Sequence, residues 1–109
     1  MTTFFFYKNL SNVELLKKIN GNFTIDAGYI IIQSYDSENN ILCIDNNREN
    51  NNKILYGKIV TFNMKLQDIL EKINEIEECK FVNKNSNYIL DTIFVSKTTG
   101  EVYKAHIIY

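Results

Sequence analysis

Hydrophobic and polar positions alternate along the 109-residue chain with two periods, and the longer period is clearest in residues 64–78. Apolar side chains recur there every three or four positions, as on one face of an α-helix: Leu66, Ile69, Leu70, Ile73 and Ile76. At about 100° of rotation per residue, Glu77 falls inside this apolar stripe, within roughly 50° of its centre. The pattern therefore predicts a helix over 64–78 with a carboxylate where a core residue is expected.

A second helix is predicted over residues 11–19. Ser11 and Glu14 match the capping box, in which a serine hydroxyl and a glutamate carboxylate satisfy free backbone N–H groups at the start of a helix. An apolar face follows, and Asn20-Gly21 supplies a typical C-terminal stop. We therefore expect Ser11 to be the N-cap of this helix.

Runs of β-branched and aromatic residues, separated by polar turns, predict the strands. They cover residues 2–7, 28–35, 41–45, 54–62, 88–96 and 101–109. The second and third runs are expected to form a hairpin, and the polar stretch 46–53 an exposed loop. Gly57 interrupts the fourth run, which is typical of a kink, a bulge or a close approach of another group to the backbone.

The expected order of elements is strand, helix, three strands, helix, two strands. This order suits an α+β domain with a curved mixed β-sheet or barrel and two main helices. With 45% hydrophobic residues and no proline, the chain fits one compact domain over residues 1–109.

Charge and composition exclude several classes of partner. The formal net charge is −1 and the basic residues are dispersed, which gives no electrostatic footprint for nucleic acid. The apolar start of the chain is too short to span a bilayer and lacks the basic residues of a secretory signal. Cys43 and Cys79 are too far apart for a metal-ligand pair, and we interpret them as buried or half-buried thiols in a reducing compartment. We expect a cytoplasmic protein that binds no metal, nucleic acid or membrane.

Glu77 is the first candidate for chemistry. A carboxylate among apolar neighbours loses hydration, which raises its pKa and suits it to general acid or base catalysis near neutral pH. Alternatively, Glu77 lies in the fraying last turn of its helix and points outward to water. The hydrophobic pattern alone leaves both interpretations open.

The turn between the first strand and the first helix is the second candidate. Free backbone N–H groups and the positive end of the helix dipole favour an anionic group there, such as a carboxylate or phosphate. The candidate substrate-binding residues of this turn are Tyr7, Lys8, Asn9, Leu10 and Ser11. Tyr88 could line the same pocket, although a core position is favoured for both tyrosines. His106, the one histidine, has no neighbours at the spacing of a triad or metal site.

Short motifs along the whole chain resemble those of one enzyme family. Phe6-Tyr7-Lys8-Asn9-Leu10 stands where its first strand ends in a Tyr-Gly-Ser-Asn or Tyr-Gly-Thr-Leu turn, and Leu55-Tyr56-Gly57-Lys58-Ile59 where a strand carries an internal glycine. Ile73-Asn74-Glu75-Ile76-Glu77-Glu78 occupies the place of a Leu-Asp-x-x-Glu-Gly pattern. Strands at Tyr88–Val95 and Ala105–Tyr109 complete the set, which resembles the gamma-glutamylcyclotransferase-like family.

The resemblance implies a fold, a reaction and a catalytic residue. Glu77 takes the position of the family's catalytic acid/base, and the turn that begins at Tyr7 holds the γ-glutamyl portion of the substrate. In the implied reaction the substrate's α-amino nitrogen attacks its γ-carbonyl and releases 5-oxoproline with an amine or amino acid, without a metal or organic cofactor. Lys8, Asn74 and Glu78 stand where the family patterns have Gly, Asp and Gly.

Two alternatives remain open. Lys8 adds a positive charge to the turn, and abundant Asn, Ile and Lys are typical of AT-rich coding. Both features suit a phage or viral protein that uses the same pocket to bind or cleave a small nucleotide or amino-acid-containing signal molecule. The chain also fits a non-catalytic interaction domain that uses a strand face or the Asn-rich loop. Both pocket interpretations require a small-molecule ligand with an anionic group.

Overall fold

The computed structural model describes residues 1–7, 11–39, 41–45, 49–76 and 90–109. Within these ranges seven strands and two helices follow one another along the chain. Their bounds are β1 Thr2–Phe6, α1 Val13–Ile19, β2 Phe23–Ile32, β3 Ser34–Asp36, β4 Ile41–Cys43, β5 Lys53–Phe62, α2 Leu66–Glu75, β6 Leu90–Lys97 and β7 Val102–Ile108.

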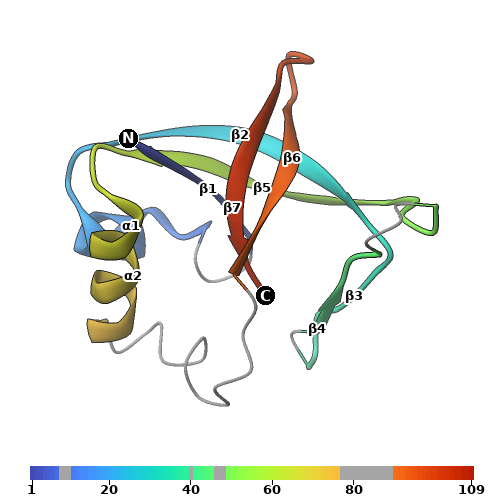
Figure 1. The fold of residues 1–109 in the computed structure, drawn as a ribbon, viewed down its shortest axis with the longest axis horizontal. Coiled ribbons are helices and arrows are strands. Elements are labelled where there is room, and N and C mark those ends of the chain that lie inside the picture. The colour runs from blue at the N-terminus through green and yellow to red at the C-terminus, as the bar shows by residue number, and fades with distance from the viewer. Residues whose placement is uncertain (8–10, 40, 46–48, 77–89) are drawn as a thin grey trace.

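Five strands form a closed barrel in the order β1-β5-β2-β6-β7, and β3 pairs with β4 in a separate two-stranded sheet. β7 closes the barrel by parallel pairing with β1, at Phe4 and His106, whereas the other neighbours pair antiparallel. The predicted fold class, an α+β domain with a mixed sheet closed as a barrel and two helices, is confirmed. In Figure 1, α1 and α2 lie at one end of the long β2–β5 ribbon and the β3–β4 hairpin lies at the other.

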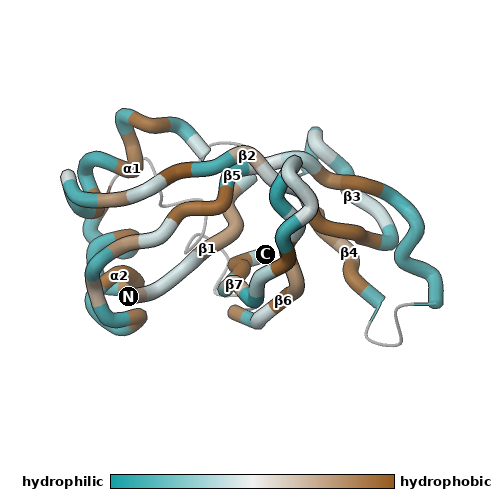
Figure 2. The backbone as a smooth tube through the Cα atoms, turned by 90° about the horizontal axis from the view of Figure 1, so that it is seen from above, coloured by the Kyte–Doolittle hydropathy of each residue, from teal (hydrophilic) through white to brown (hydrophobic). Residues whose placement is uncertain are grey.

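The two faces of the barrel wall carry separate hydrophobic cores, because successive residues of a strand point to opposite faces. The core inside the barrel contains Phe5, Ile30, Ile32, Leu42, Ile59, Val95, Ala105 and Ile107. The core between the barrel and the helices contains Phe4, Phe6, Leu15, Leu16, Ile19, Val60, Phe62, Ile69, Ile73, Ile76 and Ile108. Figure 2 shows the corresponding hydrophobic segments in both helices, in β2 and in the β3–β4 hairpin.

Two elements differ from the sequence-based prediction by three or more residues at one or both ends. The helix predicted over 64–78 ends at Glu75, because Ile76 has an extended backbone and its N–H bonds back to the carbonyls of Lys72 and Ile73. The strand predicted over 28–35 begins at Phe23 and ends at Ile32, and β3 follows it as a separate strand. In the described part of the chain, four strands rather than the predicted three therefore lie between the helices. The first five residues of β2, which the predicted strand leaves out, are held in the sheet by their pairing with β5.

The other strand predictions agree with the structure in the described ranges. β1, β5, β6 and β7 fall within one or two residues of the predicted runs, as far as those runs are described. The predicted hairpin is present in narrower form, since only Ser34–Asp36 pairs with Ile41–Cys43. Among the described residues, no helix is long and apolar enough to cross a membrane.

The N-cap of α1 is Asn12 rather than Ser11. The Asn12 side-chain oxygen accepts a hydrogen bond of 2.9 Å from the backbone N–H of Glu14, and the helix starts at Val13. The predicted capping box at Ser11 is therefore wrong by one residue. Asparagine competes well with serine for this position because its carbonyl oxygen reaches the second N–H of the helix equally well.

Candidate functional site

Most of the predicted site lies outside the described residues. Glu77, Lys8, Asn9, Leu10 and Tyr88 fall in the ranges 8–10 and 77–89, so the expected pairing of Glu77 with the turn stays a prediction. The described members are Tyr7, directly after β1, and Ser11, directly before the N-cap of α1. They mark the two sides of the turn between β1 and α1.

Tyr7 is half-buried and packs against the core inside the barrel. Its hydroxyl donates a 3.4 Å hydrogen bond to the carbonyl of Ile108, and its ring meets the ring of Tyr35 edge-on with centroids 5.4 Å apart. Burial raises the pKa of Tyr7 well above its ordinary value, and Tyr35 and Tyr109 raise it further. The hydroxyl is therefore a protonated hydrogen-bond donor at neutral pH, and its ring is a core aromatic as favoured from the sequence.

Three tyrosines gather at this end of the barrel interior: Tyr7, Tyr35 and Tyr109. Burial raises the pKa of Tyr109, and the nearby Asp91 carboxyl and Cys43 thiol add to that shift. Cys43 is exposed, which contradicts the expectation of a buried or half-buried thiol. The reason is strand alternation, because Leu42 takes the inward position of β4 and its neighbour points outward. Cys79 lies outside the described residues.

Three motifs of the sequence resemblance meet where β1 ends. β1 and β5 run so close together that a Cβ on Gly57 would lie 2.4 Å from the carbonyl oxygen of Phe6. Of the three interpretations of this glycine, the structure supports close approach of a neighbouring backbone. The last strand reaches the same region, since its Ile108 carbonyl accepts the Tyr7 hydrogen bond.

His106 packs against the core, whereas Lys104 lies on the surface. The half-buried His106 ring lies 5.5 Å from the ring of Phe4, centroid to centroid, at the face that the helices cover. Lys104 is exposed, and its ammonium lies 5.5 Å from the centroid of the Phe94 ring. Among the described residues, no three His, Cys, Asp or Glu side chains gather in a way that could hold a metal ion.

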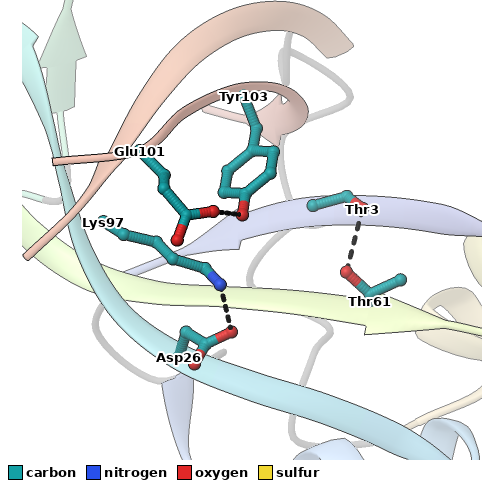
Figure 3. A network of polar contacts seen from close by, with 6 residues as sticks. All are labelled: Thr3, Asp26, Thr61, Lys97, Glu101 and Tyr103. Carbon is teal, nitrogen blue, oxygen red and sulfur yellow. Dashed lines mark hydrogen bonds and ion pairs between the residues drawn. The ribbon is translucent and has the colours of Figure 1, made fainter. Parts of the chain in front are cut away.

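A polar network lies beside the β6–β7 hairpin (Figure 3). The Lys97 ammonium lies 3.3 Å from the Asp26 carboxylate and 5.2 Å from the centroid of the Tyr103 ring, and the Tyr103 hydroxyl donates to Glu101. Hydrogen bonds to Tyr103 and Asp26 raise the pKa of Lys97. Nearby in the same view, Thr3 and Thr61 share a 2.9 Å hydrogen bond between β1 and β5.

Sequence reasoning missed both this network and the grouping of the tyrosines. Lys97 ends β6 and Tyr103 lies near the start of β7, six residues later, so their proximity could have been anticipated. Asp26 joins them only through the pairing of β2 with β6 at Gly28 and Tyr29, which no local pattern indicates. The sequence-based reasoning also missed a cavity between β2 and β6.

Comparison with known proteins yielded no relative. No protein-family model, no curated protein and no solved structure matches the chain. Any functional assignment therefore depends on the residues and their arrangement.

Proposed function

We propose that this protein is a small cyclotransferase-like enzyme that acts on a γ-glutamyl amine or dipeptide and releases 5-oxoproline. The supporting observation is the meeting of Tyr7, Gly57 and Ile108 at one end of a closed barrel. These positions belong to three separate motifs of the sequence resemblance. β1 lies between β7 and β5 in the closed barrel, and this strand order places the three motifs beside one another.

In the proposed reaction, the turn after Tyr7 holds the α-carboxylate of the γ-glutamyl group, and Glu77 takes a proton from its α-amino group. The amino nitrogen forms a bond to the γ-carbonyl carbon, and the bond from that carbon to the leaving nitrogen breaks. Glu77 then returns the proton to the leaving amine. Because both reacting ends belong to one bound molecule, the site mainly has to hold them in a reactive geometry.

Tyr7 has a limited part in this proposal. Since burial raises its pKa, its hydroxyl stays protonated at neutral pH and can donate a hydrogen bond but cannot serve as the base. Proton transfer is therefore assigned to Glu77, and Tyr7 and Ser11 are assigned to the pocket wall.

Glu77→Gln tests the proposal, because it keeps the side-chain shape and removes the base. We expect 5-oxoproline formation from γ-glutamyl dipeptides and amines, measured by mass spectrometry, to fall about 100-fold or more. Glu75→Gln is the matched control. Glu75 is exposed in the last turn of α2, 3.8 Å from the Lys72 ammonium.

The control should leave turnover within about twofold of the unmodified protein. Equal turnover in Glu77→Gln and the unmodified protein would rule out Glu77 as the acid/base. If the unmodified protein produces no 5-oxoproline from any γ-glutamyl substrate, the proposal as a whole is wrong.

A second candidate is favoured by Lys8. Its positive charge would favour a phosphate at the turn, so the same pocket would bind or cleave a small nucleotide-containing signal molecule. Native mass spectrometry of the purified protein should then detect a retained nucleotide, and Lys8→Gly should abolish its retention. Retention that is unchanged in Lys8→Gly would count against this candidate.

A further inference from the structure

The barrel wall opens between β2 and β6. These strands pair at only two positions, Gly28 with Lys97 and Tyr29 with Ser96, whereas β2 pairs with β5 along its whole length. In Figure 1 the two strands cross and then diverge. If the same register continued, Ile31 would face Phe94. Both side chains instead line an opening in the wall and remain exposed, at 41% and 45%.

A cavity of about 360 Å³ lies in this opening. It is lined by Ile31, Ile44, Asp45, Asn51, Asp91, Thr92, Ile93, Phe94, Ser96 and Ile107. The volume lies in the range of small-molecule pockets, which run from roughly 300 to 1,000 Å³. Four isoleucines and a phenylalanine provide apolar walls, and the buried Ile107 connects them to the core inside the barrel.

Among the described residues that line the cavity, both ionisable groups are acidic. Asp45 and Asp91 contribute two carboxylates, and the part of the lining that the structure describes contains no lysine, arginine or histidine. The remaining polar groups are the Asn51 amide and the hydroxyls of Thr92 and Ser96. Such a cavity attracts a positive charge and offers hydrogen-bond acceptors to it.

Both carboxylates belong to ordered local structure. The backbone N–H of Asp45 donates to the Asn51 side-chain oxygen at 2.8 Å, and the Asn51 amide nitrogen donates to the Asp45 carbonyl at 2.9 Å. The Asn50 amide donates to the Asp45 carboxylate at 2.8 Å. The Asp91 carboxylate accepts the N–H of Thr92 at 2.7 Å. Each of the two carboxylates therefore accepts a hydrogen bond from a nearby group of the chain.

We propose that this cavity binds an organic cation, a primary amine or guanidinium group carried on an aliphatic or aromatic chain. The chain packs against Ile31, Ile93 and Phe94, and the cation meets Asp45 and Asp91. A metal ion fits less well, since the described residues provide no group of three metal-ligating side chains. The proposal is independent of Glu77 and of the proposed cyclotransferase activity.

The test is a titration of the ¹⁵N-labelled protein with 2-phenylethylamine at neutral pH, followed by NMR chemical shifts. Matched probes are 2-phenylethanol, which lacks the charge, and 3-phenylpropanoate, which reverses it. We expect the amine to shift the amides of Asp45, Asn51 and residues 91–96. Because a charge-assisted hydrogen bond is stronger than a neutral one, the alcohol should bind about tenfold more weakly and the acid should cause no shifts.

Asp91→Asn keeps the hydrogen bond to Thr92 and removes the charge, so it should weaken amine binding about tenfold. Asp45→Asn should act in the same direction. Asp68→Asn, which neutralises an exposed acid on α2, is the matched control and should leave binding unchanged.

Equal binding of the amine and the alcohol by the unmodified protein would overturn the proposal, even if neither variant folds. The proposal would also be overturned if a neutral extended peptide shifted the amide signals along the opening between β2 and β6 and the amine shifted none. That result would mean that the opening accepts an added β-strand rather than a cation.

Discussion

Gly57 lies where β1 and β5 approach too closely for a side chain. A Cβ there would be 2.4 Å from the Phe6 carbonyl oxygen and 2.6 Å from the ring of Phe5. Both neighbours belong to the packed barrel wall and cannot move away cheaply. We expect Gly57→Ala to lower the free energy of unfolding by about 2 kcal/mol or more, measured by urea denaturation.

Gly21→Ala is the control for this prediction, because nothing lies within 4 Å of the added Cβ. It should change the unfolding free energy by less than about 1 kcal/mol, in either direction. Equal effects of the two substitutions would show that the β1 backbone leaves room for a side chain at position 57.

Burial of Tyr7 makes the free energy of unfolding depend on pH in the alkaline range. Its folded-state pKa is raised by burial, whereas the unfolded tyrosine titrates at about 10. Below that pH the hydroxyl is protonated in both states and adds no pH dependence. Above it, only the unfolded state loses the proton, so stability falls as the pH rises from about 10 towards the folded-state pKa.

Tyr7→Phe should therefore reduce the loss of stability between about pH 9 and pH 11, measured by urea denaturation at each pH. At neutral pH the substitution should cost only about 0.5–1 kcal/mol, since it removes one neutral hydrogen bond. Tyr56→Phe, at a side chain that is 69% exposed, is the control. An unchanged alkaline slope in Tyr7→Phe would contradict the burial of this hydroxyl.

At the scale of elements, two substitutions can test whether the N-cap of α1 is Asn12, as in the structure, or Ser11, as the sequence predicts. Because the Asn12 side chain satisfies the N–H of Glu14, Asn12→Ala should destabilise the protein by about 1 kcal/mol in thermal or urea unfolding. Ser11→Ala should cost less, since Ser11 precedes the cap. A larger cost for Ser11→Ala would restore the capping box that the sequence predicts.

At the scale of the molecule, the barrel and the β3–β4 hairpin should differ in local stability. In the described part of the chain, β2 and β5 pair over ten residues and separate the two cores, whereas β3 and β4 pair with each other over three residues. We expect hairpin amides to exchange with solvent through local opening. Their opening free energy should lie at least about 2 kcal/mol below that of the β2–β5 amides in hydrogen exchange followed by NMR.

Uniform protection across the hairpin and the barrel would contradict this expectation. It would mean that Leu42, a hairpin residue buried in the core inside the barrel, couples the hairpin and the barrel into one cooperative unit.

Local patterns in the sequence determined most of the elements. The aromatic run of β1, the β-branched runs of the later strands and the apolar stripe of α2 each carry their own period, so their type can be inferred without the fold. The cap of α1 and the end of α2 could not be fixed in this way. Neighbouring residues of similar propensity compete for such positions, and packing decides between them.

The sequence by itself also determined the α+β class and pointed to Gly57 and Tyr7, because a glycine inside a strand and a tyrosine at a strand end are local features. Only the tertiary structure decided that Tyr7 meets Tyr35 and Tyr109, that Asp26 reaches Lys97 and that Asp45 and Asp91 share a cavity. These residues are distant in the chain. Barrel closure and the short pairing of β2 with β6 bring them together, and strand pairing is set by the packing of the whole domain rather than by any single segment.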